Sequence, residues 1–357
     1  MSAHEILIVI MAAFAVLGAL DRILGNKIGL GKEFEEGILA MGALALAMVG
    51  IIALAPVLAG LLRPVVVPVY SFLGADPAMF AGTILACDMG GAALAQELTA
   101  DPEAALLGGL VGGSMLGATI VFTIPVAMGI LSQEDRPYLA KGILAGIVTI
   151  PVGVLVSGLV AGFPFGKVLR NLLPIVLIAA IIAVGLWRAE RAMIKGFGWF
   201  GKGVVAVITI GLAAAIVEGL TGFAVIPGMV PVEEGFQTVG AIAIVLAGAF
   251  PLVWTVTKLL RKPLLKAGAL LGINDTAAAG LVATLANSIA TFGMVKDMDN
   301  RGKVVNVAFA VSAAFVFGDH LGFTASFAPQ MLPAVILGKL AGGISAVAVA
   351  LWLTRKG

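Results

Sequence analysis

Few residues of this sequence could do chemistry, and the first group of them lies inside two apolar segments. Asp88 stands in the middle of the apolar segment 77–97, and Asn287 and Ser288 stand at the corresponding place in the segment 275–295. An ionisable side chain within an apolar membrane segment is costly to bury and therefore indicates function. We expect Asp88, Asn287 and Ser288 to contact a solute. The alternative is that Asp88 and Asn287 only cap the ends of half-helices.

A second group of polar residues, Asp319 and His320, lies inside the apolar stretch 304–328. A histidine titrates near physiological pH and can bind a proton or donate to a hydroxyl, whereas an aspartate offers a full negative charge to a cationic solute. Adjacent residues point in different directions on a helix, so we expect one of the two to face the solute path. The alternative is a structural pair held by backbone groups or by Ser114.

Other kinds of chemistry find little support in the sequence. No nucleophile, base and orienting group occur at a usable spacing, so we predict that the protein is not an enzyme. The lone cysteine excludes an intrachain disulfide, and only two histidines argue against a zinc or haem site, so we expect no metal and no cofactor. A net charge of +2 with scattered basic residues argues against nucleic-acid binding.

The elements that must position these residues are membrane helices. Hydrophobic residues make up 61% of the chain and charged residues only 12%, whereas a soluble domain carries about 25% charged residues. Several apolar runs reach roughly 20 residues, the length that crosses a hydrocarbon core. The sequence predicts an all-α polytopic membrane protein with a single transport domain, 1–357, in a lipid bilayer. The full spans are expected near 3–22, 37–62, 104–131, 138–163, 171–190, 203–226, 235–260, 304–328 and 334–354.

The two halves of the chain resemble each other at an offset of 198 residues. Transporter folds commonly contain such repeats. We discount matches among apolar residues, which arise by composition alone, and the similarity survives in Gly, Pro and Glu. We expect repeat one at about 3–163, a linking span at about 166–195 and repeat two at about 201–354. The matches include EEG at 35–37 with 233–235 and LG at 73–74 with 271–272.

The charges that flank the two polar segments indicate that the repeats are inverted. Both ends of 275–295 carry basic residues and are expected to be cytoplasmic, so this segment is a re-entrant hairpin rather than a full span. Both ends of 77–97 carry acidic residues and are expected to be external. Two hairpins among eleven apolar segments leave nine full spans, with the N-terminus outside and Arg355-Lys356 inside. The flanking residues are Lys258, Arg261, Lys262, Lys266, Lys296, Arg301 and Lys303 for the second segment, and Asp76, Glu97, Asp101 and Glu103 for the first.

Three runs of the sequence carry a resemblance to a known family. They are GKEFEEGILAMGALALAMVG at 31–50, CDMGGAA at 87–93 and FGDHLGF at 317–323. These runs resemble the EutH family of ethanolamine-utilisation membrane transporters. The resemblance implies uptake of ethanolamine across the bacterial inner membrane, in bacteria that use it as a carbon and nitrogen source.

Ethanolamine at neutral pH is a small ammonium ion with one hydroxyl. A carboxylate of Asp88 or Asp319 could pair with it, while the ring of Phe317 or Phe323 supplies cation–π attraction. We expect alternating access, with the hairpin tips meeting at a central site. A uniporter, coupling to H⁺ through His320 or to Na⁺, and a gated channel remain open, as does a homo-oligomer.

Overall fold

The computed structural model describes residues 2–355, and the chain is helical throughout this range. The side chains at 260–262, 264–267 and 269 lie outside the described part. Three of the basic residues used to predict topology, Arg261, Lys262 and Lys266, are therefore outside it, as is Lys356.

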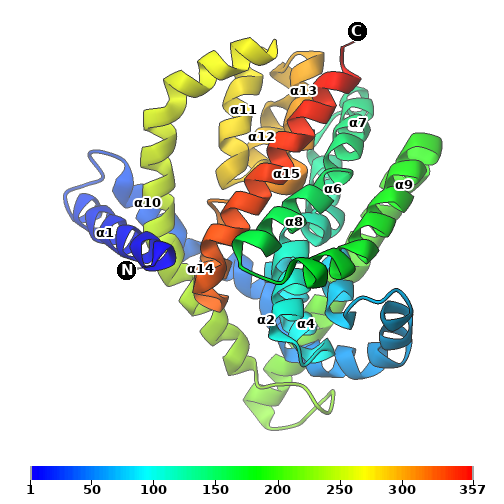
Figure 1. Cartoon of the computed structure of the whole chain (residues 1–357). Helices are drawn as coiled ribbons and strands as arrows, with labels where there is room; N and C mark the ends of the chain where they lie inside the picture. The colour runs from blue at the N-terminus through cyan, green and yellow to red at the C-terminus, as the bar shows by residue number, and fades with distance from the viewer. Residues whose placement is uncertain (1, 356–357) are drawn as a thin grey trace.

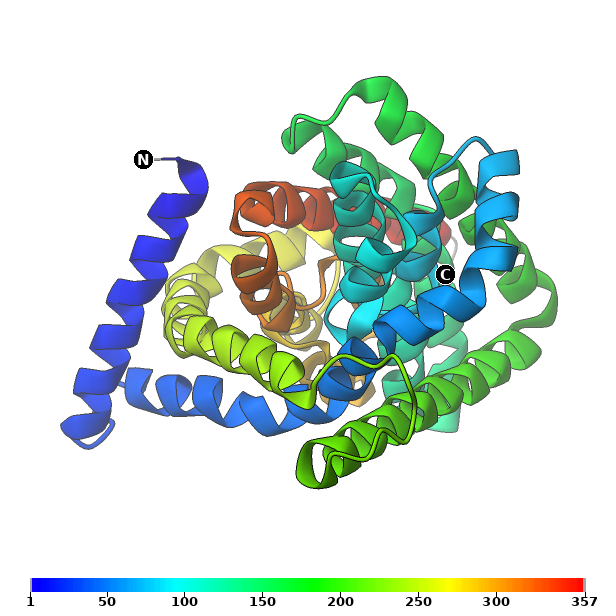
Figure 2. The ribbon, with the colours of Figure 1, turned by 90° about the horizontal axis from the view of Figure 1, so that it is seen from below.

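The helices follow one another with short connections, and Figure 1 shows α15 crossing the middle of the molecule beside α8. At the periphery, α1 packs against α2 and α10, and Figure 2 shows it along one edge. The α-helices are α1 (Ala3–Ile23), α2 (Leu30–Phe72), α3 (Ala81–Ile84), α4 (Ala92–Leu98), α5 (Pro102–Ala105), α6 (Ile124–Ile130), α7 (Arg136–Ile147), α8 (Ile150–Val160), α9 (Phe165–Thr221), α10 (Val232–Leu271), α11 (Asp275–Ala286), α12 (Ser288–Met294), α13 (Asn300–Ala313), α14 (Asp319–Phe327) and α15 (Leu332–Leu353). Short 3₁₀ and π-helical stretches join some of them: η1 (Pro77–Phe80), η2 (Cys87–Gly91), η3 (Leu106–Gly117), η4 (Thr119–Thr123), η5 (Gln133–Asp135), η6 (Val295–Asp297) and η7 (Pro329–Met331).

Seven helices of the described chain are long and apolar enough to cross a membrane, so the protein is a multi-pass membrane protein. Nine full spans were expected, and two regions account for the difference. The expected spans 171–190 and 203–226 lie in the single helix α9, whose 57 residues make it roughly 85 Å long, well beyond the ~30 Å of a hydrocarbon core. Non-helical backbone at Ala189 divides α9 into two legs, which Figure 2 shows in different directions.

The other difference concerns 304–328, which was expected to be one continuous span and is broken. Helix α13 ends at Ala313 and α14 begins at Asp319, and Phe315 between them has a φ of 61°. The break frees backbone N–H groups that must find partners in an apolar environment. Phe315 N–H donates to the carbonyl of Thr284 at 3.2 Å, and Phe317 N–H donates to that of Leu285 at 2.9 Å. The broken helix thus attaches to the C-terminal end of α11.

The two polar segments both double back on themselves. At the base of the first, Thr99 Oγ1 donates to Asp76 Oδ2 at 2.8 Å. At the base of the second, the backbone N–H of Asn274 donates to Asp299 Oδ1 at 2.8 Å, and its side-chain Nδ2 donates to the carbonyl of Asp297 at 3.0 Å. Because the two ends of each segment meet, we name residues 76–99 hairpin 1 and residues 274–299 hairpin 2. Figure 1 places α11 and α12 of hairpin 2 in the upper half of the molecule and α4 of hairpin 1 in the lower half.

Hairpin 1 rests on glycines of the π-helical stretch η3. A Cβ added at Gly113 would lie 2.9 Å from the backbone nitrogen of Cys87, and one added at Gly117 would overlap the carbonyl oxygen of Leu85. The glycines at 109, 113 and 117 are spaced four residues apart, as in the small-residue motifs that permit close packing of membrane helices, and all three contact hairpin 1. This seat sets the depth of the hairpin tip.

Candidate functional site

Three ionisable side chains from different parts of the chain meet in the interior. Asp88 comes from the tip of hairpin 1, His320 from the first turn of α14, and Lys339 from the first half of α15. His320 is 3% exposed and Lys339 is 1% exposed, while the Asp88 side chain is 13% exposed. Buried charges are normally paired, so the contacts among these three groups decide what the site can do.

The three groups form a polar chain, Lys339–His320–Asp88. Lys339 Nζ donates to the backbone carbonyl of Ser114 at 2.5 Å and to His320 Nδ1 at 3.1 Å. An ammonium group can only donate, so Nδ1 must accept, and a neutral ring then carries its proton on Nε2. That nitrogen lies 3.7 Å from Asp88 Oδ1. The imidazole therefore stands between an ammonium and a carboxylate.

Local sequence explains how Asp88 reaches this position. The η2 turn contains non-helical backbone at Met89 and a φ of 88° at Gly90, a conformation that glycine adopts without strain. A Cβ at Gly90 would overlap the side chain of Ile51 on α2, so the turn also needs a residue without a side chain for packing. The glycines that follow Asp88 thus allow the chain to reverse with the carboxylate at the tip.

A cavity of about 130 Å³ adjoins the carboxylate of Asp88. A single water needs on the order of 10–15 Å³ of such space, so the cavity has room for a solute of four non-hydrogen atoms. The ring of Phe323 lines it and stacks on Phe327, with centroids 5.1 Å apart. Thr238 and the exposed Gln96 add polar groups to the wall. The cavity combines one charge, one aromatic face and a few hydrogen-bonding groups.

The structure brings together five of the residues expected to form the site. Asp88 and His320 are in the polar chain, and Phe323 lines the cavity. Asp319 is half-buried at the start of α14, and its carboxylate and that of Asp88 repel each other. Ser114 participates through its backbone carbonyl, because its hydroxyl donates to the carbonyl of Val111 at 2.9 Å.

The other three expected residues lie apart from the polar chain. Asn287 is exposed, and its side-chain oxygen accepts from the N–H of Ile289 at 2.8 Å, which is the capping contact of the alternative interpretation. Ser288 is buried, and its hydroxyl has no hydrogen-bond partner within the described part of the chain. Phe317 is half-buried in the break between α13 and α14. Contact of these residues with a solute stays a prediction.

Sequence reasoning missed Lys339, although the sequence carries the signal. Lys339 is the only charged residue of α15, whose surroundings (Pro329–Leu353) otherwise qualify as an apolar span. The expected span 334–354 contains this one lysine, and burying an ionised lysine in a membrane segment is as costly as burying an aspartate. Phe315 was missed as well. Its ring lies 5.4 Å from that of His320 and packs edge-on against Phe122.

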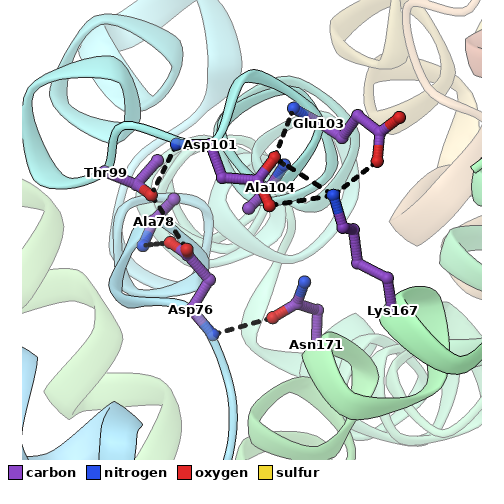
Figure 3. Close-up of polar contacts among 8 residues, drawn as sticks. All are labelled: Asp76, Ala78, Thr99, Asp101, Glu103, Ala104, Lys167 and Asn171. Atoms are coloured by element: carbon purple, nitrogen blue, oxygen red, sulfur yellow. Dashed lines mark hydrogen bonds and ion pairs between the residues drawn. The ribbon is translucent and has the colours of Figure 1, made fainter.

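The base of hairpin 1 is fastened to α9 by the polar contacts in Figure 3. Lys167 Nζ lies 2.9 Å from Asp101 Oδ2 and 2.6 Å from Glu103 Oε2, and Asn171 Oδ1 accepts from the N–H of Asp76 at 2.8 Å. Partial burial raises the pKa of the Asp101 carboxyl, but hydrogen bonds from Lys167 and from two backbone N–H groups outweigh this effect. The pKa of Asp101 is therefore lower than that of an ordinary aspartate.

Comparison with known families decides what kind of protein holds this site. The family model described as "Ethanolamine utilisation protein, EutH" matches residues 3–353, nearly the whole chain. The chain belongs to the EutH family. The predicted resemblance is thereby confirmed.

Relatives match the chain over almost its full length. A Listeria monocytogenes protein named "Probable ethanolamine permease EutH" is 62% identical over all of this chain and 95% of its own length. A Salmonella typhimurium protein of the same name is 50% identical over all of this chain and 97% of its own length. The Bacillus subtilis protein YxeR, named as uncharacterized, is 54% identical over 99% of this chain. No solved structure matches the chain.

A metal ion is a poor fit to the site of this EutH-family chain. The thiol of Cys87, a carboxylate oxygen of Asp88 and a ring nitrogen of His320 lie within 4.8 Å of one another, which is close enough for shared coordination. The imidazole, however, already accepts from Lys339 at Nδ1 and carries its proton on Nε2, so the neutral ring has no free lone pair to offer a metal ion. Asp88 and Cys87 alone are too few ligands for a metal site.

Proposed function

We propose that this protein takes up ethanolamine across the bacterial inner membrane by alternating access. The observation that carries the proposal is the carboxylate of Asp88 at the tip of hairpin 1, beside a cavity of about 130 Å³ with an aromatic wall. The relatives named as probable ethanolamine permeases support the choice of solute. The protein is then a transporter and not an enzyme.

The cavity offers a partner for each part of the ethanolammonium ion. Its ammonium group pairs with Asp88, and the face of Phe323 adds cation–π attraction, which is worth up to about 2 kcal/mol when desolvated. Its hydroxyl can bond to Thr238 or Gln96. Thr238 Oγ1 already donates to the carbonyl of Glu234, so it retains lone pairs to accept a bond from the solute.

Two inverted repeats, about 3–163 and 201–354 with a linking span at about 166–195, would allow the two halves to exchange roles. Residues at equivalent positions, 198 residues apart, cap equivalent helices in the two halves. Asp76 and Asn274 each cap the first helix of a hairpin, and Asp101 and Asp299 each cap the helix that follows it. In this proposal the two legs of α9 and the broken stretch 304–328 each cross the membrane, which gives nine full spans, and the two hairpins enter from opposite faces. Inverted-repeat transporters likewise bind their solute near the midplane with discontinuous helices.

Asn287 and Ser288 lie outside the polar chain, but alternating access could still bring them to the solute. Hairpin 1 is buried at its tip, whereas hairpin 2 exposes Asn287 at its own. A carrier that alternates has one side closed and the other open, so we propose that Asn287, Ser288 and Phe317 approach the solute when hairpin 2 closes. Asp319 then joins Asp88 as a second negative group beside the cation.

The test is uptake of labelled ethanolamine by the purified protein in liposomes, with and without Na⁺ and at several external pH values. We expect saturable uptake that unlabelled ethanolamine inhibits. Replacing Asp88 by Asn removes a charge-assisted bond worth about 1.5–3 kcal/mol, so the KM should rise roughly 10- to 150-fold. Glu36→Gln, at an exposed position on α2, is the control and should leave the KM unchanged.

The outcomes separate the classes of function. Flux that increases linearly with solute concentration and never saturates would identify a gated channel for small amines. Wild-type protein without ethanolamine uptake would refute the proposed function. Normal uptake by Asp88→Asn and by Asp319→Asn would leave the function standing and remove the proposed site.

A further inference from the structure

The buried ammonium of Lys339 has no role in the proposed function. Its side chain is 1% exposed in an apolar helix, where an uncompensated charge is costly. Its direct partners are a backbone carbonyl and an imidazole nitrogen, neither of which carries a charge when the ring is neutral. The balancing negative charge is that of Asp88, on the far side of the imidazole.

The groups that face Lys339 can be named from each element that packs around it. His320 comes from α14, and Asp88 and Cys87 come from η2. Of the other elements packed against α15, η3, η7 and α8 contain no titratable side chain. The titratable side chains of α1, α7 and α13 are those of His4, Glu5, Asp21, Arg22, Arg136, Tyr138, Lys141, Arg301 and Lys303. Among these groups, His320 is the one bonded to Lys339, and the carboxylate of Asp88 lies on the other side of its ring. The charge of Lys339 therefore depends on whether Asp88 is free to balance it.

A cationic solute changes this balance. In the conformation of this structure, before hairpin 2 closes and Asp319 approaches, an ethanolammonium ion that pairs with Asp88 leaves two buried ammonium groups to share one carboxylate. Two like charges separated by an imidazole in a low-dielectric interior repel strongly. The site, with two ammonium groups and one carboxylate, becomes neutral again only if one ammonium loses a proton. The solute nitrogen keeps its proton because it contacts Asp88 directly, whereas Lys339 has lost its counter-charge.

We propose that Lys339 is the resident cation of the transport site and releases one proton each time an ethanolammonium ion binds at Asp88. This proposal rests on the proposed function, since it assumes that ethanolammonium binds there. The polar chain supplies the route. The Nζ–H bond of Lys339 breaks as an N–H bond forms at His320 Nδ1. The proton on Nε2 passes to Asp88 Oδ1, which lies 3.7 Å away and lines the cavity, and from this carboxylate to solvent. The reverse transfers reload Lys339 after the solute leaves.

The consequence is exchange of one ethanolammonium ion for one proton, without net movement of charge. The solute enters as a cation, and Lys339 gives its proton to the outside and takes another from the cytoplasm. Uptake should then be insensitive to membrane potential. A protein without a titratable group at position 339 would move one net charge, and a potential of 100 mV, inside negative, would support roughly 50-fold accumulation.

The experiment measures protons released when ethanolamine at pH 6 is added to weakly buffered, purified protein. We expect about one proton per bound solute for the wild type and for the control Lys202→Met, which changes an exposed lysine of α9. Lys339→Met keeps an unbranched apolar chain and should release none. Lys339→Gln is the second variant, and thermal unfolding shows which variants are folded. In liposomes, both position-339 variants should gain potential-driven uptake that the wild type lacks.

The possible failures are distinguishable. Wild-type protein that binds ethanolamine saturably but releases no proton overturns the role of Lys339 and leaves the proposed function intact. Equal proton release by wild type and a folded position-339 variant also overturns it, because the proton must come from another group. Wild-type protein that does not bind ethanolamine refutes the proposed function itself.

Discussion

The ion pair between Lys303 and Asp135 gives the sharpest prediction about stability. Lys303 Nζ lies 2.6 Å from Asp135 Oδ1, and the two side chains are only 12% and 7% exposed. Ser132 Oγ donates to the other carboxylate oxygen at 3.0 Å, and Lys303 also lies 5.3 Å from the ring centroid of Tyr138. The pair joins the start of α13, at the base of hairpin 2, to the start of α7.

Removal of one partner leaves the other charge buried without compensation, which typically costs about 3–5 kcal/mol. At an unfolding entropy of about 2.1 cal/mol/K per residue, this corresponds to a fall of roughly 4–7 °C in the thermal midpoint. Asp135→Asn and Lys303→Met should each show it. The double variant removes both charges and should return to within about 1 kcal/mol of the wild type, because buried pairs themselves contribute little net stability.

The assay is thermal unfolding of the four proteins in the same detergent, analysed as a double-mutant cycle. Lys32→Met is the control, since Lys32 lies 3.7 Å from Glu36 in an exposed pair, which is worth only about 0–1 kcal/mol. Additive effects of the two single substitutions would refute the reasoning. They would mean that each residue contributes through its own packing and not through the charge of the other.

Two further predictions concern hairpin 1. The lowered pKa of Asp101 means that its ionised form contributes stability above the ordinary aspartate pKa of about 3.9, and that this contribution is lost as the pH falls through that value and then through the lowered pKa. The thermal midpoints of wild type and Asp101→Asn should therefore converge between pH 6 and pH 3, and a constant difference would contradict the ion pair with Lys167. Gly117→Ala places a Cβ against the carbonyl of Leu85 and should lift the hairpin from its seat, at a cost of about 1–3 kcal/mol. Its ethanolamine uptake should fall more than that of the control Gly42→Ala, where a Cβ meets open space, and equal uptake by both would show that the seat does not position Asp88.

The sequence was sufficient to predict the membrane class and the doubled-back segments, because both follow from local signals. Long apolar runs indicate spans. Acidic residues on both sides of 77–97, and basic residues on both sides of 275–295, indicate that the two ends of each segment lie on the same face. The ties between Asp76 and Thr99 and between Asn274 and Asp299 now show the ends of each segment together. The number of full spans could not be predicted from apolar composition, because composition reveals neither the break at 314–318 nor that 171–190 and 203–226 belong to one element, α9, which is kinked at Ala189.

The candidate site was predicted only in part, because partners far apart in sequence are decided by packing. Asp88 and His320 stood out as isolated polar residues, but 232 positions separate them. Nothing local indicates that hairpin 1 and α14 meet. Lys339 differs from these distant partners, because a single lysine in an apolar helix can be recognised from the local sequence alone. Basic residues deserve the same weight as acidic ones in such segments, because both are costly to bury.

Lys167, Lys303 and Lys339, taken together, separate the contacts that position the hairpins from those that bind the solute. Lys167 fastens the base of hairpin 1 near Asp101, which precedes the helical stretch 102–130, and Lys303 pairs with Asp135 beyond the other end of that stretch. A stretch of 29 residues is roughly 40 Å long if helical, so these two contacts lie too far from each other to share a ligand. Lys339 alone connects to the carboxylate that lines the cavity. Substitutions at the two ends should therefore change how firmly the hairpins are held, whereas substitution of Lys339 should change the charge that accompanies the solute.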